Sequence, residues 1–414
     1  MRILLSAIYP YAFLLLYLII PFDNYIRALP NILLIILLVT FPFIIKKSDF
    51  KKIKILPIAI FTLLFAYLCF NSLVAGRWTE DFNIIKKVLI ALGLAILYIP
   101  VTDFDSTWGR AAKIKMAIIL SSLAAIAFSV YNFVLITDAT GSFALGNSPQ
   151  VVESLLIDRL YLGLLSTFSI LISFQSIKKD FHPNNNYHLA NIFINLLFIV
   201  LIASKIAGIS LFILLLIRQF YGQRKAWKMI IAGIAIVAIG GLVFLMKSES
   251  PNPLDPDKNP KTSLALIENT RTYELRAVVW ECVANIISEE GFTWTGDGFE
   301  ATENKLLSCY DSQITEPIKR FNFLNQKYNT HNQFLDFYLS AGFIALLLFV
   351  VFIVVSFITV RKQFVPTAML AILIMYSFLE NVFHRQIGAY YIGFIVIIII
   401  TSALTVENKN INRT

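Results

Sequence analysis

Long apolar stretches separated by short polar segments run through most of the chain. A helix crosses a membrane with roughly 20 apolar residues, within a working range of about 17 to 25. On this scale the sequence predicts an all-α, polytopic membrane protein with about 12 transmembrane helices. The predicted spans are Ile3–Ile20, Leu29–Ile45, Ile55–Ala75, Val88–Val101, Met116–Ile136, Leu160–Ile177, Leu189–Ala203, Ile206–Ile217, Met229–Met246, Phe334–Val360, Phe364–Leu379 and Ala389–Leu404.

The predicted seventh and eighth spans are separated by a lysine inside an apolar run. From Leu189 to Ile217 the run has roughly thirty residues, too many for one ordinary span and enough for two short helices with a tight turn. Ser204 and Lys205 are then expected at this turn, at the outer face of the membrane. Lys205 either binds a phosphate through its ammonium group or marks a helix end by extending towards water.

One long polar segment, residues 247–329, interrupts the apolar pattern late in the chain. It predicts three regions: residues 1–246 with the first nine spans, the loop itself, and residues 330–414 with three spans and a tail. The loop begins with a proline-rich stretch that is typical of irregular chain.

Within the loop, the segment from Glu268 to Ser288 has apolar residues at a spacing of three and four, which predicts an amphipathic helix. The polar side of this helix carries Arg271 and Arg276. We therefore expect the helix to lie along the membrane surface, with both guanidinium groups where lipid phosphates are found.

Composition and charge agree with a membrane protein and predict its orientation. Hydrophobic residues make up 57% of the 414 residues and charged residues 15%, and the mean hydropathy is +0.72. With a cytoplasmic N-terminus, the inner loops hold about 19 basic residues and the short outer loops about 7, the bias that cytoplasmic retention of Lys and Arg produces. Both termini are therefore expected in the cytoplasm and the long loop in the periplasm. The net charge of +9 then indicates contact with anionic membrane lipids and not nucleic-acid binding.

The three cysteines, Cys69, Cys282 and Cys309, match neither a disulfide framework nor a zinc spacing. Cys282 and Cys309 can pair if their loop is extracytoplasmic, although the unpaired state is favoured. The Gly296–Phe299 turn lacks the preceding strand and following helix of a nucleotide-binding fingerprint. The sequence thus predicts no metal and no cofactor.

His331 is the strongest candidate for chemistry. It lies in the segment Asn329–Leu335, where the polar loop ends and an apolar span begins. An imidazole ordinarily titrates near pH 6.5 and can take or give a proton at neutral pH. A lone histidine at a helix start can also be an interfacial or capping residue, but the loop arginines on the same side of the membrane favour the functional interpretation.

Two further polar groups are predicted at the outer ends of spans. Arg159 can join an anion site, although pairing with Asp158 or Glu153, or interfacial anchoring, is the simpler expectation. Glu380–Gln386 forms a polar cluster that can orient catalytic groups, although charge pairing at the helix end is again simpler.

Three motifs occur in a fixed order in the second half of the chain. The segment Arg276–Trp280 (RAVVW) is similar to the arginine-x-x-x-aromatic motif of the O-antigen ligase and polymerase superfamily. Gly296–Phe299 (GDGF) is similar to the glycine-rich turn that follows in that family, and His331–Ile344 (HNQFLDFYLSAGFI) resembles its histidine-asparagine motif. With the span layout, the resemblance covers nearly the whole chain and is strongest to an O-antigen ligase.

The resemblance implies a fold like that of the type C glycosyltransferases. It also implies transfer of a glycan from undecaprenyl pyrophosphate to a hydroxyl of an acceptor such as lipid A-core, outside the cytoplasmic membrane of a bacterium. His331 and Arg276 are the implied catalytic residues, with His331 accepting the hydroxyl proton and cationic donors stabilising the leaving pyrophosphate without a metal. Direct attack would invert the anomeric carbon. His331 can instead bind the pyrophosphate as a cation, and a two-step route through Asp336 or Glu380 stays open.

The implied pyrophosphate-binding residues are Lys205, Arg271, Arg159 and Asn332. Family members often have a serine-arginine or threonine-arginine pair where this chain has Ser204–Lys205. Lysine keeps the charge but lacks the planar fork that grips a phosphate with two parallel hydrogen bonds. Arg159 and Arg271 match family positions only loosely.

Several functions compete with the ligase interpretation, which the single large outer loop favours. A polymerase that joins repeat units uses the same donor and much the same residues, and transfer to a protein hydroxyl is a further variant. A glycolipid transporter or flippase also has many spans and predicts an inverted repeat with broken helices near the membrane midplane. Here the unusual polar residues are expected at one outer face, which favours chemistry at the surface.

Overall fold

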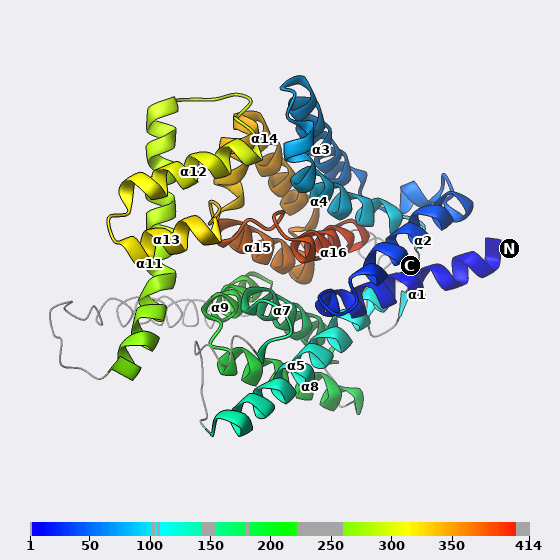
Figure 1. Cartoon of the computed structure of the whole chain (residues 1–414). Coiled ribbons are helices and arrows are strands. Elements are labelled where there is room, and N and C mark those ends of the chain that lie inside the picture. The colour runs from blue at the N-terminus through cyan, green and yellow to red at the C-terminus, as the bar shows by residue number, and fades with distance from the viewer. Residues whose placement is uncertain are drawn as a thin grey trace.

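The computed structural model describes residues 2–101, 104–105, 108–141, 154–178, 182–221 and 260–402, without the side chains of residues 104, 140 and 260–274. Within these ranges the chain is helical apart from one antiparallel pair of two-residue strands, β1 (Phe104–Asp105) and β2 (Gly109–Arg110). The helices, labelled in Figure 1 where there is room, are α1 (Arg2–Ile19), η1 (Ile20–Phe22), α2 (Ala28–Ile44), η2 (Asp49–Lys52), α3 (Ile55–Val74), α4 (Trp78–Leu97), α5 (Ala112–Thr140), α7 (Arg159–Ser176), α8 (Asn184–Leu201), α9 (Lys205–Phe220), α11 (Pro260–Glu290), α12 (Phe299–Gln313), α13 (Pro317–Gln326), α14 (Gln333–Val360), α15 (Phe364–Leu379) and α16 (Gln386–Ser402).

The all-α membrane class is confirmed, whereas the count of about 12 crossings is not. Met229–Met246 lies outside the described residues, and every other predicted span overlaps a helix. Among the described helices, four are long and apolar enough to cross a membrane, namely Arg2–Phe22, Ile55–Val74, Ala112–Ala139 and Gln333–Val360.

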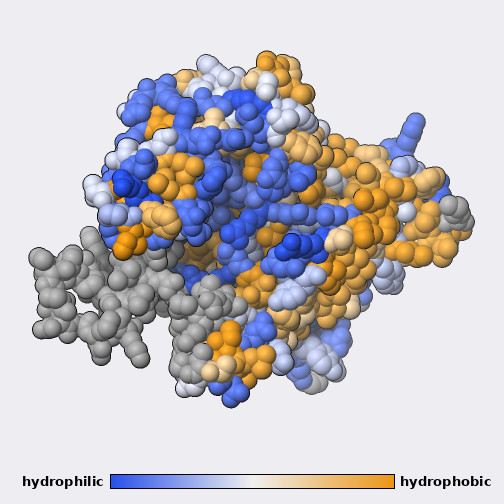
Figure 2. All heavy atoms as spheres, in the orientation of Figure 1, coloured by the Kyte–Doolittle hydropathy of each residue, from blue (hydrophilic) through white to orange (hydrophobic). Residues whose placement is uncertain are grey.

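The described helices form two neighbouring groups (Figure 1). In one group α4 packs along α16 and α3 along α14; in the other α7 packs against α5, α8 and α9, and α15 contacts both groups. The helices α11, α12 and α13 lie beside the first group, where α12 contacts α4 and α14. Figure 2 shows hydrophilic residues gathered over α12 and towards α15 and α16, with hydrophobic residues over α1 and α2.

The predicted turn between the seventh and eighth spans is present between α8 and α9. Ser204 Oγ accepts a hydrogen bond from Ala207 N and caps α9, and Lys205, the first residue of that helix, is exposed. A Cβ atom on Gly163 of α7 would lie only 2.6 Å from Ser204 Oγ. The start of α7 and the α8–α9 turn are therefore in close contact.

The helix at the predicted fourth span, Val88–Val101, is α4, which begins earlier, at Trp78, with polar turns and ends at Leu97. This polar part contacts the loop before α12. Asp81 Oδ1 accepts a hydrogen bond from Phe299 N at 2.8 Å, and Arg77 Nη1 donates to Gly296 O at 3.0 Å. Arg77 and Asp81, whose charges are unfavourable in a membrane span, therefore hold the glycine-rich turn in place.

The long helix α14 consists of two segments joined by a break at Gly342. This glycine has a φ of 79° and a ψ of −179°, a conformation that residues with a Cβ rarely adopt. A Cβ atom here would lie 2.1 Å from the carbonyl oxygen of Trp294. The glycine thus lets the loop backbone pass directly against the break.

The loop backbone pairs with the main-chain groups that the break frees. These pairs are Asp297 N to Leu339 O (3.0 Å), Gly298 N to Ser340 O (2.8 Å) and Phe343 N to Thr293 O (3.0 Å). The carbonyl of Ala341 accepts a hydrogen bond from Tyr67 Oη of α3 at 3.0 Å. Because buried main-chain groups are costly when unpaired, the glycine-rich turn and the break at Gly342 form one structural unit.

The apolar face of α11 packs on protein and is not covered by lipid, whereas the position of this helix relative to the membrane surface stays a prediction. Val279, Cys282 and Val283 are at most 2% exposed, in one cluster with Leu306 and Tyr310 of α12. The three-and-four spacing correctly identified an apolar face. It could not identify whether lipid or another helix covers that face.

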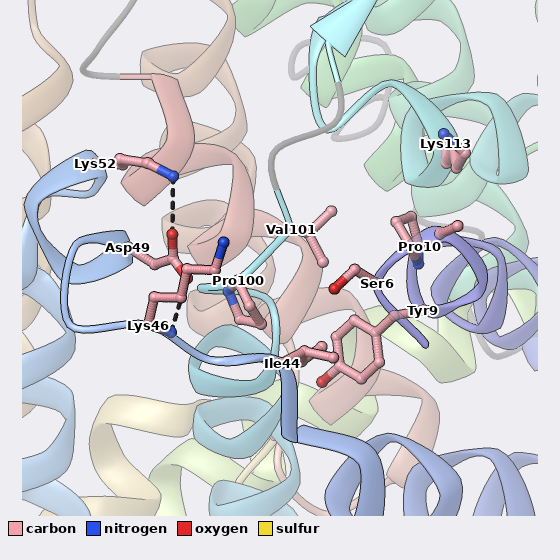
Figure 3. Close-up of a pocket in the computed structure, with 11 residues that line it drawn as sticks. Ser6, Tyr9, Pro10, Ile44, Lys46, Asp49, Lys52, Pro100, Val101 and Lys113 are labelled. Carbon is pink, nitrogen blue, oxygen red and sulfur yellow. Dashed lines mark hydrogen bonds and ion pairs between the residues drawn. The ribbon is translucent and has the colours of Figure 1, made fainter. Parts of the chain in front are cut away.

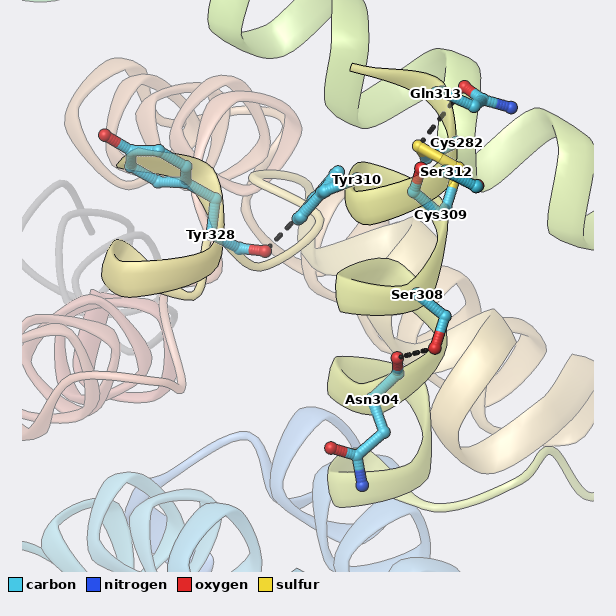
Figure 4. Close-up of a disulfide and its surroundings, with 8 residues drawn as sticks. All are labelled: Cys282, Asn304, Ser308, Cys309, Tyr310, Ser312, Gln313 and Tyr328. Carbon is cyan, nitrogen blue, oxygen red and sulfur yellow. Dashed lines mark hydrogen bonds between the residues drawn. A yellow bond between two sulfur atoms is a disulfide. The ribbon is translucent and has the colours of Figure 1, made fainter. Parts of the chain in front are cut away.

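A disulfide between Cys282 and Cys309 joins α11 to α12, with their Cα atoms 5.8 Å apart (Figure 4). The expectation of unpaired cysteines is therefore wrong, because the spacing along the chain does not reveal which helices pack together. Next to the disulfide, Tyr310 Oη donates to Tyr328 O at 3.0 Å. This bond connects α12 to the segment that leads into His331.

Replacement of Cys282 and Cys309 by serine is expected to lower the free energy of unfolding of this helical unit. The sequence separation is 27 residues, and closing a loop of this length contributes roughly 3 to 4 kcal/mol. Urea unfolding followed by tryptophan fluorescence measures the change. Reduction of the wild-type protein is the control for the added hydroxyls, and equal midpoints before and after reduction would contradict the prediction.

Candidate active site

His331 has an uncommon backbone conformation that its neighbours fix. Its φ of 44° lies in the left-handed region, which costs free energy for a non-glycine residue unless the surroundings impose it. Asn329 Oδ1 accepts a hydrogen bond from His331 N at 3.0 Å. Trp280 Nε1, from the arginine motif of α11, donates to Thr330 O at 3.1 Å. Two of the motifs found in the sequence therefore meet at this loop.

Glu380, the residue after α15, contacts the imidazole of His331. Its Oε2 atom lies 3.2 Å from His331 Nδ1. Because an ionised carboxylate only accepts hydrogen bonds, the pair assigns the proton of a neutral imidazole to Nδ1. The other nitrogen, Nε2, is then the proton acceptor. It is buried and has no hydrogen-bond partner among the described residues.

Arg276 of α11 lies beside the end of α15, where its Nη2 atom donates a hydrogen bond to Leu379 O at 3.2 Å. Leu379 is the residue before Glu380. Burial lowers the pKa of Arg276, against the effect of the Glu380 carboxylate. Burial alone would raise the pKa of Glu380, but the hydrogen bond from His331 and the electrostatic effects of His331, Arg385 and Arg276 together hold it below the ordinary 4.5. The carboxylate is therefore ionised at neutral pH, and its stabilising interactions are lost only as the pH falls below its usual titration range.

The turn between α15 and α16 also holds the start of α14. Asn381 Oδ1 accepts hydrogen bonds from Asn332 N at 2.6 Å and from Thr330 Oγ1 at 3.0 Å. Phe383 N donates to Gln333 Oε1 at 3.0 Å. Asn381 and Gln333 are fully buried, so these bonds fix the position of the residues on both sides of His331.

A second histidine-carboxylate pair lies one helical turn further along α14. His384 Nε2 is 3.0 Å from Asp336 Oδ2, and Gln333 Nε2 donates to the same oxygen at 3.1 Å. Lys87 Nζ of α4 donates to the carbonyl of His384. The Asp336 carboxylate is thus held between α14 and the α15–α16 turn.

Asn332 caps α14. Its Oδ1 atom accepts hydrogen bonds from Phe334 N at 3.0 Å and Leu335 N at 3.2 Å, an arrangement that stabilises a helix start. The side-chain oxygen is therefore engaged within the helix cap. The side chain of Arg271 lies outside the described residues.

Arg159 and Lys205 are the first residues of α7 and α9. The adjacent Asp158 caps α7 through Leu160 N, and it pairs with Arg385 Nη1 at 3.0 Å. Since α7 and the α8–α9 turn are in contact, the starts of both helices lie on the side of the α15–α16 turn. Among the described residues, no hydrogen bond or ion pair joins Lys205 to His331.

From the sequence, simple charge pairing at the helix end is the expectation for the Glu380–Gln386 cluster. In the structure, Glu380 contacts His331 and His384 contacts Asp336. Polar residues directly after an apolar helix are costly near lipid and indicate a functional site. That signal was present, but the partners depend on the tertiary fold and not on local sequence.

The fold and the site define an all-helical membrane protein in which a histidine, a carboxylate and an arginine meet at helix ends beside a helical loop. Residues 190–350 match the family model described as O-antigen ligase, and this match supports the resemblance to the O-antigen ligase superfamily that the motifs indicate. Its members are glycosyltransferase-like enzymes, ligases and polymerases. The matched region contains Arg276 and His331, whereas Glu380 follows it. No curated protein matches the chain.

Proposed function

We propose that the protein is an O-antigen ligase-like glycosyltransferase that moves a glycan from undecaprenyl pyrophosphate to a hydroxyl of lipid A-core. The supporting observation is the pairing of His331 Nδ1 with Glu380, which leaves a buried Nε2 atom as proton acceptor, while Arg276 acts on the same carboxylate and donates to the adjacent Leu379 O. A fixed base and a fixed cation in one site suit a transfer with a pyrophosphate leaving group. No cofactor takes part in this proposal.

In the proposed reaction, the acceptor oxygen attacks the anomeric carbon while the bond from that carbon to the pyrophosphate oxygen breaks. His331 Nε2 takes the hydroxyl proton, and Glu380 stabilises the resulting imidazolium through Nδ1. The pyrophosphate leaves with the electron pair of the broken bond. Attack opposite to the leaving group inverts the configuration at the anomeric carbon.

Arg276 is proposed to stabilise the negative charge that develops on the leaving pyrophosphate. Donors already aimed at such a charge lower the barrier without a nucleotide or a metal. Lys205 and Arg159, on the side of the α15–α16 turn, and Arg271 are further candidates for binding the donor. Asn332, as the cap of α14, is proposed to contribute by holding the loop of His331.

The surroundings of the two carboxylates support a single displacement. Asp336 is 2% exposed and is bonded to His384 and Gln333, and Glu380 is bonded to His331. A carboxylate held in this way is poorly placed to attack a sugar and form the covalent intermediate of a two-step route.

The catalytic atoms are covered in this structure. Both His331 Nε2 and Arg276 Nε have almost no solvent-accessible surface and lack a hydrogen-bond partner among the described residues. A substrate must therefore displace the covering side chains, and we expect the catalytic hydrogen bonds to form only in the complex.

The site is proposed to face the periplasm from the bacterial inner membrane, with both termini in the cytoplasm. The distribution of lysine and arginine supports this orientation. The disulfide between Cys282 and Cys309 supports it independently, because disulfides persist in oxidising compartments.

Replacement of Glu380 by glutamine is expected to slow transfer roughly tenfold. A hydrogen bond to a charged group contributes about 1.5 to 3 kcal/mol and a neutral one about 1 kcal/mol, and glutamine keeps only the neutral bond. Glu300→Gln, on the exposed surface of α12, is the control, and an unchanged rate in Glu380→Gln would contradict the role.

The test of the proposed function is product identification with separate acceptors. Purified protein is incubated with a lipid-linked glycan and either lipid A-core or a second lipid-linked repeat unit. Transfer to lipid A-core supports the ligase. Extension of the second repeat would establish the polymerase instead, a protein acceptor tests the third variant, and no product with any acceptor would favour a transporter.

A further inference from the structure

A basic groove lies at the ends of α3 and α14 that are opposite to the candidate active site. The last turns of α3 contact the loop of the site, because Asn71 donates a hydrogen bond to Thr295 O. The groove lies at the other end of α3, beside its first residues, Ile55 and Leu56. Similarly, α14 begins at the site and ends at the groove. The groove has a volume of about 760 Å³ and is lined by Phe50, Lys51, Ile53, Lys54, Ile55, Leu56, Ile358, Thr359, Arg361 and Lys362.

Four of the lining residues are basic, and none of the lining residues within the described part of the chain is acidic. These basic residues are Lys51, Lys54, Arg361 and Lys362. A neighbouring pocket, lined by Lys46 and Lys52 among others, differs because Asp49 accepts hydrogen bonds from Lys52 Nζ and Lys46 N (Figure 3). That pocket contains its own counterion, whereas the groove between α3 and α14 presents an excess of positive charge.

The groove continues into apolar helix surface. Ile55 and Leu56 at the start of α3 are 50% and 58% exposed, and Ile358 near the end of α14 is 54% exposed. Both helices are long and apolar enough to cross a membrane. Basic side chains at the end of two such helices, with exposed apolar residues beside them, match a phosphate group joined to acyl chains.

We infer that this groove binds the headgroup of an anionic phospholipid from the membrane leaflet on this side. The phosphate lies among the four basic residues, and the acyl chains follow the exposed faces of α3 and α14. The amide groups at the start of α3, where no side chain caps the helix, add hydrogen-bond donors for an anion. The site is separate from the candidate active site and does not depend on the proposed transfer reaction.

Native mass spectrometry of the purified full-length protein tests this site. The protein is titrated with phosphatidylglycerol, with phosphatidylcholine or with inorganic phosphate. We expect phosphatidylglycerol to bind first and most tightly. In Arg361→Gln/Lys362→Gln its affinity should fall about 25-fold, since each basic residue near an anionic surface contributes about a fivefold factor.

The matched control is Lys47→Gln/Lys178→Gln, which removes two exposed positive charges that do not line the groove, and its affinity for phosphatidylglycerol should stay close to that of the wild type. Equal binding of both lipids, binding of inorganic phosphate without a preference for phosphatidylglycerol, or equal losses in both variants would overturn the proposal. If Arg361→Gln/Lys362→Gln does not fold, Lys51→Gln/Lys54→Gln tests the opposite wall of the groove with the same expected loss.

Discussion

Replacement of His331 by alanine is expected to lower the rate of glycan transfer by about 10² to 10⁴-fold, the usual contribution of a general base. In the proposed reaction, Glu380 acts on the acceptor proton through this imidazole. The helix cap by Asn332 and the bonds of Asn381 do not involve the His331 side chain, so the variant should fold. Product formation per amount of purified membrane protein is the measurement.

Two further variants separate the possible roles of this histidine. His182→Ala, which removes a side chain that accepts a hydrogen bond from Asn184 N away from the site, should transfer at nearly the wild-type rate. His331→Arg keeps a cation but cannot take up a proton. Activity restored by arginine would show that His331 holds the pyrophosphate, and a near-normal rate in His331→Ala would remove it from the chemistry.

Replacement of Arg276 by lysine is expected to slow transfer roughly 10 to 100-fold. The guanidinium donates to Leu379 O and keeps a buried Nε atom without a partner among the described residues. The ammonium group of lysine is a single point charge without the planar fork of a guanidinium, so it cannot replace both the donor to Leu379 O and the Nε donor. Losing one hydrogen bond to a charged group costs about 1.5 to 3 kcal/mol. Initial rates at saturating donor measure the loss.

Arg320 supplies the control for this change. It lies on α13 with a side chain 44% exposed and a weak contact to Asp311, and surface ion pairs contribute little. Arg320→Lys should therefore leave the rate nearly unchanged. If Arg276→Lys and Arg320→Lys are equally tolerated, Arg276 has no part in stabilising the leaving group.

The helical architecture could be predicted from sequence because the length of an apolar run is a direct consequence of membrane thickness. The same rule failed where protein and not lipid surrounds a helix. The polar start of α4 contacts the loop through Arg77 and Asp81, so it does not have the composition of a span. The break at Gly342 could not be predicted either, because an apolar run does not indicate where another segment of backbone packs against it.

Only part of the candidate site could be predicted from the sequence, because the remaining contacts depend on how distant helices pack together. His331 and Arg276 stood out through local motifs, and the structure brings both to Glu380. Glu380 itself lies 49 positions from His331, and no local pattern indicates that contact. The disulfide of Cys282 was missed in the same way, since it depends on the packing of α11 against α12.

The anomeric configuration of the newly formed linkage tests the proposed one-step transfer most directly. A donor of known configuration is converted by the purified protein, and NMR coupling constants assign the configuration in the product. With His331 as base and Asp336 and Glu380 engaged by histidines, the product linkage should have the configuration opposite to that of the donor. Retention would contradict this mechanism, because it requires two displacements through a covalent intermediate.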